Sequence, residues 1–111
     1  MARYESIDAF LADLPRLTAG VRDRLCGQSG LFELTTKQGR HLFVRLDDGL
    51  ITLPETAPAE KPDCVVTADE RDLLAIANRE QSPVTAILFG KVKVRGNRAL
   101  LLKLAGIMIG A

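Results

Sequence analysis

Apolar residues near the start of the chain recur with the spacing of an amphipathic helix. Behind a capping serine, Ser6, the apolar positions are Ile7, Phe10, Leu11 and Leu14. This i, i+3, i+4, i+7 pattern predicts a helix, and Pro15 is expected to end it because proline lacks the amide hydrogen that a helix interior needs. Apolar residues continue at helical spacing over residues 17–25, which predicts a second, short helix.

The pattern then changes to short segments typical of strands. Residues 31–36, 40–46 and 50–53 are such segments, and tight turns separate them. Within the middle one, Leu42, Val44 and Leu46 share one face, while His41, Phe43 and Arg45 share the other. The three segments predict an antiparallel meander, with Asp48-Gly49 as its second turn.

Three prolines between residues 54 and 62 separate this meander from the rest of the chain. A segment with so many prolines is a poor helix and a poor central strand, so we expect a connector. Residues 64–67 then predict a short buried strand. Thr67 and Glu70 match a capping box, which predicts a helix over residues 68–79.

The last part of the chain alternates cations with valines before an apolar helix. Pro83 predicts the start of a short helix that reaches residue 89. Lys91, Lys93 and Arg95 are two apart and share one face of a strand. Gly96-Asn97 is expected to end the strand and to cap a helix. That helix carries more apolar surface than one core contact can cover, so we expect something else to cover the remainder.

Composition fits a single globular domain over residues 1–111. Hydrophobic residues make up 47% of the chain and charged residues 26%, which is close to the average of folded proteins. No apolar run approaches the ~18 residues that span a bilayer, and the N-terminus lacks the apolar core of a signal peptide, so we expect a cytoplasmic protein. Cys26 and Cys64 form no motif and are expected to be buried thiols.

A net charge of +1 conceals an uneven distribution. Residues 1–80 carry 10 basic and 14 acidic side chains, whereas residues 81–111 carry five basic and none acidic. Such a basic end can attract an anionic membrane surface or nucleic acid, or it can simply be a solvated strand face. Nucleic-acid binding is disfavoured because Phe89 is the basic end's one aromatic residue on which a base could stack.

Catalytic chemistry finds little support in the sequence. His41 has no serine or cysteine placed to act as a nucleophile, and a surface histidine is the simpler interpretation. Asp47-Asp48 precedes Gly49, so a hairpin explains it better than a carboxylate pair does. Gly90-Lys91 lacks the serine or threonine of a phosphate-binding loop. No metal-ligand motif is present either.

The strand-to-helix segment resembles the C-terminal signature of sterol carrier protein 2 domains. The matching residues are 89–97 (FGKVKVRGN), followed by Ala99-Leu100 and Lys103-Leu104. This resemblance implies an α+β fold in which helices cover a five-stranded, mixed but mainly antiparallel sheet and enclose an apolar tunnel for sterols, fatty acyl chains or related lipids. It implies neither catalysis nor a cofactor.

Under this resemblance, eight apolar residues are expected to supply the tunnel wall. They are Leu73, Ile76, Leu88, Phe89, Leu101, Leu104, Ile107 and Met108. Lys91, Lys93 and Arg95 are expected to dock the domain on anionic membranes. The same fold also serves as a dimerisation or accessory module, as in ubiquinone biosynthesis, so the apolar tail could instead pack on a protein partner.

Two departures from the family pattern change these expectations. Eukaryotic members commonly carry a ligand-contacting glutamine after the Lys-Leu pair, where this chain has Ala105, which disfavours sterol specificity. The chain also ends without the peroxisomal Ser-Lys-Leu address. The resemblance is therefore closest to a small, stand-alone bacterial-type member.

Overall fold

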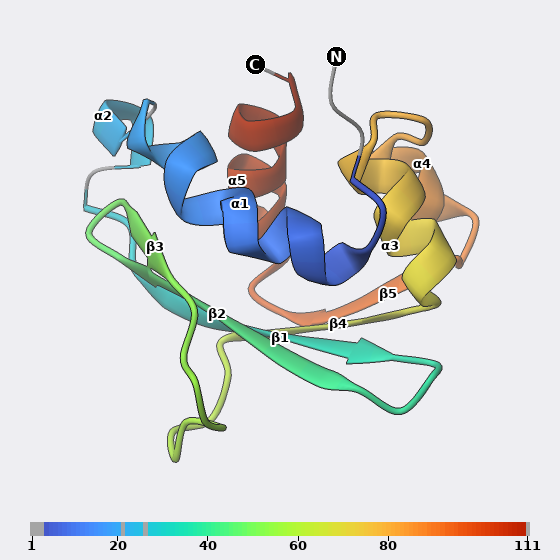
Figure 1. Ribbon diagram of the computed structural model, residues 1–111, viewed down its shortest axis with the longest axis horizontal. Helices are drawn as coiled ribbons and strands as arrows, with labels where there is room; N and C mark the ends of the chain where they lie inside the picture. The colour runs from blue at the N-terminus through green and yellow to red at the C-terminus, as the bar shows by residue number, and fades with distance from the viewer. Residues whose placement is uncertain (1–3, 21, 26, 111) are drawn as a thin grey trace.

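A computed structural model describes residues 4–20, 22–25 and 27–110, including their side chains except at positions 22, 25 and 105–110. One five-stranded sheet forms the base of the molecule, and the helices all lie on one of its faces (Figure 1). In chain order the elements are α1 (Ile7–Ala19), α2 (Arg22–Leu25), β1 (Gly30–Thr36), β2 (His41–Asp47), β3 (Leu50–Thr52), β4 (Cys64–Ala68), α3 (Glu70–Ala77), α4 (Pro83–Leu88), β5 (Val92–Gly96) and α5 (Arg98–Gly110).

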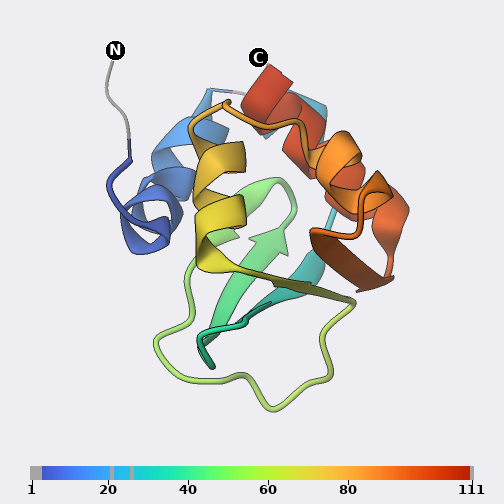
Figure 2. The same ribbon diagram turned by 90° about the vertical axis from the view of Figure 1, so that its right-hand side faces the viewer.

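The sheet confirms the predicted meander and the predicted mixed topology. Its strand order is β3-β2-β1-β4-β5, and every neighbouring pair is antiparallel except β1 with β4. That pair is parallel because the proline-rich connector carries the chain from the β3 edge back to the middle of the sheet. The connector lies on the side away from the helices (Figures 1 and 2).

The turn between β2 and β3 is the predicted two-residue hairpin. Asp48 has φ 47° and Gly49 has φ 83°, and positive values at both positions are what a type I′ turn requires. The Asp48 carboxylate accepts a hydrogen bond of 2.7 Å from the Gly27 amide. Asp48 therefore has a structural role in the turn.

Helix α1 continues through Pro15, so the prediction that this proline ends it was wrong. Leu14 and Thr18 are both buried on the same side of α1, and Leu17 packs against the core. This continuous inner face outweighs the one backbone hydrogen bond that a proline removes. The predicted second helix shrinks to α2.

Helix α3 is capped by Asp69 and not by the predicted Thr67. The Asp69 carboxylate accepts a hydrogen bond of 2.8 Å from the Arg71 amide. Thr67 lies within β4, opposite Thr35 on β1 and Lys93 on β5. The strand thus extends one residue further than predicted, because ladder hydrogen bonds on both sides hold it.

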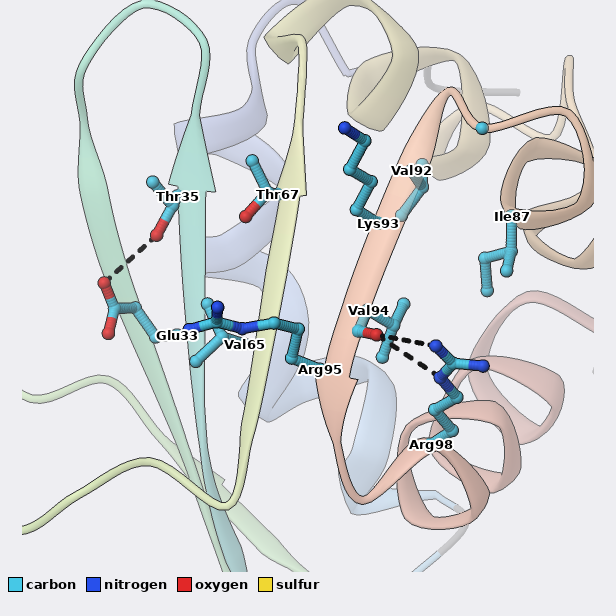
Figure 3. A pocket seen from close by; sticks show the side chains of 11 residues that line it. Glu33, Thr35, Val65, Thr67, Ile87, Val92, Lys93, Val94, Arg95 and Arg98 are labelled. Carbon is cyan, nitrogen blue, oxygen red and sulfur yellow. Dashed lines mark hydrogen bonds between the residues drawn. The ribbon is translucent and has the colours of Figure 1, made fainter.

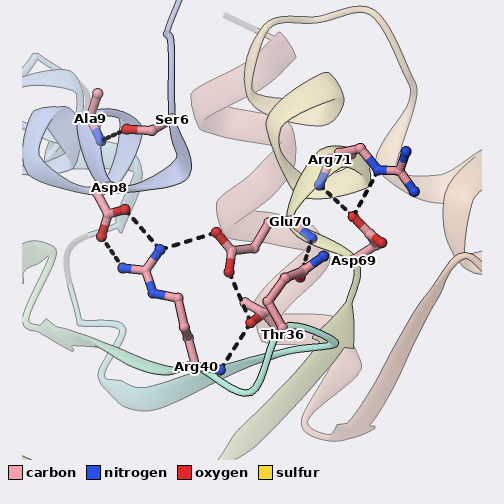
Figure 4. A network of polar contacts seen from close by, with 9 residues as sticks. Ser6, Asp8, Ala9, Thr36, Arg40, Asp69, Glu70 and Arg71 are labelled. Carbon is pink, nitrogen blue, oxygen red and sulfur yellow. Dashed lines mark hydrogen bonds and ion pairs between the residues drawn. The ribbon is translucent and has the colours of Figure 1, made fainter.

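Polar contacts join α1 and α3 to the turn between β1 and β2 (Figure 4). From that turn, Arg40 donates hydrogen bonds to Asp8 at the start of α1 and to Glu70 at the start of α3. Glu70 also accepts a hydrogen bond of 3.1 Å from the hydroxyl of the buried Thr36. One arginine therefore fixes the spacing of two helices above the sheet.

The junction between β5 and α5 forms as the sequence predicts. Gly96 ends the strand with φ 94°, a value that favours glycine. The Asn97 side chain accepts a hydrogen bond of 3.1 Å from the Leu100 amide and so caps α5.

Candidate functional site

An apolar layer fills the space between the sheet and the helices. Its lower wall comes from the inward side chains of all five strands, and its upper wall from α1, α3, α4 and α5. The strands contribute Phe32, Val44, Leu46, Ile51, Cys64, Val66, Ala68, Val92 and Val94, and the helices contribute Ile7, Leu11, Leu14, Leu73, Ile76, Ala86, Leu100 and Leu104. Side chains from distant parts of the sequence thus meet in one continuous cluster.

Four of the eight predicted wall residues lie in this layer or against it. Leu73 and Ile76 are each 9% exposed, and Leu104 is 7% exposed. Leu101 is half-buried and packs against the cluster. The backbone of the predicted residues Ile107 and Met108 belongs to α5, but their side chains lie outside the described set.

Leu88 and Phe89 lie elsewhere, which corrects their assignment to the interior wall. They are 78% and 75% exposed. Helix α4 is short, and Ala86, which is fully buried, takes its inner side. Leu88 follows about 200° further round the helix and so faces outward. Helical periodicity alone could not reveal this, because every residue from 86 to 89 is apolar.

Polar atoms inside the layer are already paired among the described residues. The hydroxyl of Thr18, which is 1% exposed, donates to the Leu14 carbonyl within α1. No buried side-chain nitrogen or oxygen of the described residues lacks a partner. The described part of the interior therefore offers apolar contacts and no spare hydrogen-bonding group.

Cys64 belongs to this layer, and its thiol is a poor nucleophile. It is 0% exposed, and burial raises the pKa of its thiol, because the thiolate would lose its hydration. The predicted buried thiol is thus confirmed at Cys64, whereas Cys26 lies outside the described residues.

The one histidine of the chain, His41, lies on the outer surface. His41 is exposed, as predicted, and its Nδ1 lies 2.7 Å from a Glu33 carboxylate oxygen on the neighbouring strand. Among the described residues, no three histidine, cysteine or acidic side chains gather in a way that could hold a metal ion. No described helix has the length and apolar character needed to cross a membrane.

A shallow, open hollow of about 750 Å³ lies over the outer face of the sheet at its β5 edge (Figure 3). Lys93 and Arg95 extend from β5 on the same side of the strand, with Thr67 and Val65 of β4 beside them. The third predicted docking cation, Lys91, is also exposed. The side chains of all three cations are thus available to solvent.

Arg98 has a role at this edge that the sequence did not reveal. Its guanidinium donates hydrogen bonds of 3.3 and 3.2 Å to the carbonyl of Val94 on β5 (Figure 3). Occupying an outward carbonyl of an edge strand blunts its ability to pair with another strand. The sequence offered one signal for this contact, an arginine two residues after the end of the strand, but the start of a helix explains an arginine there equally well.

Taken together, the molecule is an α+β domain that covers one face of a sheet with helices and encloses an apolar layer. The chain belongs to the SCP-2 sterol transfer family, whose sequence profile matches residues 9–108. The resemblance noted for residues 89–97 thus extends over almost the whole chain. Domains of this family commonly bind or transfer lipids and are typically non-catalytic, although they also occur within enzymes.

Individual relatives agree with this assignment. The chain is 38% identical to bovine sterol carrier protein 2 over 50 residues, which are 45% of this chain and 9% of that protein. It is similar to the solution structure of palmitated SCP2L2 from Aedes aegypti, with 25% identity, a TM-score of 0.65, and coverage of 93% of this chain and 94% of the other.

The same fold also occurs as part of a larger enzyme. A structure of the sec-alkyl sulfatase PisA1 superposes with a TM-score of 0.80 over 91% of this chain and 16% of that one, at 24% identity. At this level of identity the similarity concerns the fold alone.

Proposed function

We propose that this domain binds, and transfers between membranes, a hydrophobic ligand in the apolar layer between its sheet and its helices. The continuous apolar cluster between sheet and helices carries this proposal. Family membership and the palmitated relative support it. Sterol-like, fatty acyl and isoprenoid lipids all meet the requirement for an apolar tail.

Within this proposal, the ligand lies against α5 and α3. Leu73, Ile76, Leu101 and Leu104 form the part of the wall whose side chains are described. Ile107 and Met108 stay predicted wall residues, and their side chains lie outside the described set. Leu101 is the best placed to contact a guest because it is half-buried, whereas Leu104 is committed to the core. A ligand there replaces side-chain contacts and adds buried apolar surface.

The chemistry at position 105 favours an acyl or isoprenoid ligand over a sterol. A sterol hydroxyl in an apolar site needs a hydrogen-bonding partner, because burying it unpaired is costly. Ala105 supplies no such partner. A lipid whose polar head remains at the surface avoids this cost.

Uptake of a fluorescent fatty acid, cis-parinaric acid, tests the proposal. Leu101→Glu is expected to reduce uptake at least about tenfold, because an acyl tail bound there would strip water from the carboxylate. Leu50→Glu makes the same change at a 44% exposed leucine on β3 and is expected to leave uptake unchanged. Full uptake by a folded Leu101→Glu variant would refute the wall assignment.

We further propose that Lys91, Lys93 and Arg95 guide the domain to anionic membranes. All three are exposed, and each cation close to an anionic surface contributes about 1 kcal/mol to binding. Vesicle binding should therefore weaken as salt is raised. Binding that ignores both salt and lipid charge would exclude this role.

An alternative function is a dimerisation or accessory module that presents a hydrophobic intermediate to partner enzymes. The occurrence of the same fold within a sulfatase supports this alternative. The two functions differ in what accompanies the chain: a carrier holds a lipid, whereas a module holds a protein. A dimer without lipid would favour the module.

A further inference from the structure

We propose that α4 is a membrane anchor whose exposed apolar side chains insert into an anionic bilayer beside the cations of β5. The proposal rests on the docking role suggested above for Lys91, Lys93 and Arg95. It adds an inserting element to that electrostatic surface. It also gives a role to Leu88 and Phe89, which the interior does not use.

Helix α4 presents an uncharged and largely apolar outer face. Val84 and Leu88 are four residues apart and so share one side of the helix; they are 52% and 78% exposed, and Phe89 beside them is 75% exposed. Residues 81–90 contain no charged side chain. These three large apolar residues are exposed with no ionic group between them in the sequence, and an exposed apolar patch of this kind marks an interaction site.

Cations lie on two elements that contact α4, namely β5 and α5. Lys91 and Lys93 follow it directly in the sequence, and Arg98 and Lys103 lie on α5, which packs beside α4. All four are exposed, and no acidic residue occurs after residue 80. Figure 2 shows α4 beside α5 and near β5 at one end of the molecule.

The opposite edge of the sheet has a different charge. Residues 45–63, from β2 through the proline-rich connector, carry five acidic side chains and two basic ones, Arg45, which pairs with Glu60, and Lys61. Because β3 and β5 are the two outer strands, the molecule is polarised from an acidic edge to a basic, apolar edge. An anionic surface would therefore attract the α4 edge first.

A bilayer suits this surface better than a second copy of the chain does. A stable interface buries at least about 1,200 Å² in total, far more than three side chains of short α4 supply. In a symmetric dimer the same patch meets itself, so the cations of the neighbouring β5 and α5 would be brought toward like charges. Anionic lipid headgroups instead neutralise them while the apolar tip reaches the acyl region.

The chain has no tryptophan, so Phe89→Trp creates a single reporter at the tip of the anchor. With vesicles of phosphatidylcholine and phosphatidylglycerol in a ratio of about 3:1, its emission is expected to shift to the blue and to be quenched by brominated acyl chains. Leu50→Trp on β3 is the matched control and should do neither. Pure phosphatidylcholine vesicles should give little binding.

A second variant measures the contribution of insertion to binding. Leu88→Ser combined with Phe89→Ser should lower vesicle binding at least about tenfold, whereas Leu50→Ser should leave it unchanged. The substituted side chains are exposed in both variants, so both variants should fold, and circular dichroism checks this.

The outcomes separate the anchor from the docking role. Salt-sensitive binding without a blue shift would overturn the anchor and retain the electrostatic docking. No binding to anionic vesicles would overturn both. A shift that appears without vesicles as protein concentration rises, together with a dimer in sedimentation, would assign α4 to a second copy and overturn the bilayer as its occupant.

Discussion

Gly96 connects the family signature to the geometry of the fold. It has φ 94°, and a Cβ at this position would lie 2.2 Å from the carbonyl oxygen of Asp63. That same oxygen accepts a hydrogen bond of 2.9 Å from the Asn97 amide, and the Asp63 amide donates to the Leu31 carbonyl. The glycine is needed because three segments meet here, the connector, β1 and the start of α5.

Replacing Gly96 by alanine is therefore expected to destabilise the domain. The positive φ and the backbone clash together should lower the free energy of unfolding by at least about 2 kcal/mol, measured by urea denaturation. Gly20→Ala is the matched control, because Gly20 has φ −78° and a Cβ there would contact nothing within 4 Å. An equal effect of both substitutions would contradict this role for Gly96.

The contacts of Asp13 are expected to make the stability of the domain fall at acidic pH. Hydrogen bonds from Arg16 and then from the Tyr4 hydroxyl lower the pKa of Asp13 from 3.8 to about 2. A depressed carboxyl pKa contributes stability that is present above the unfolded value and is lost as pH falls through the folded value. The urea concentration at the midpoint of unfolding should therefore decrease as the pH is lowered from about 4 to about 2.

Asp13→Asn should reduce this pH dependence because the amide does not titrate. The variant should be less stable than the natural chain at neutral pH and should approach it near pH 2. If both proteins lose stability equally on acidification, the contact at Asp13 does not control this transition.

At the level of elements, the individual strands, turns and caps were easier to predict than the way in which distant segments pair. Local patterns identified the meander, the Asp48-Gly49 hairpin and the Asn97 cap. The parallel pairing of β1 with β4 depends on where the connector returns, which local patterns do not determine. The predictions that Pro15 ends the first helix and that Thr67 caps α3 were wrong for a similar reason. Tertiary packing and the hydrogen bonds of the sheet overrode these local preferences.

The candidate site was predicted less completely than the fold. The spacing of apolar residues correctly predicted that Leu73, Ile76 and Leu104 lie in the interior, because each belongs to a helix with a clear polar face or a long apolar arc. Leu88 and Phe89 belong to a helix too short to show such a contrast, and only its packing through Ala86 reveals which side is outside.

Pro15 offers a test of how α1 is stabilised. Pro15→Ala restores an amide that can bond to the Leu11 carbonyl, and it should raise the free energy of unfolding by about 1 to 3 kcal/mol. Pro83→Ala, at the first turn of α4, should give no such gain because that amide has no partner within the helix. A loss of stability in Pro15→Ala would mean that proline sets the path of α1.

The whole molecule has two regions with different proposed tasks, one inside and one at its surface. The apolar layer between sheet and helices is proposed to hold a lipid, and the α4 and β5 edge is proposed to meet a membrane. Both depend on α5, which contributes Leu100 and Leu104 to the layer and exposed cations to the edge. A carrier needs such a link, because its cargo must leave at the place where it docks.

Native mass spectrometry of the protein purified from its own host, without delipidation, tests the central claim most directly. We expect a monomer that carries one lipid and that, once delipidated, takes up an added fatty acid in a ratio of about one to one. A lipid-free dimer that refuses added fatty acid would contradict it and would favour the protein-interaction module.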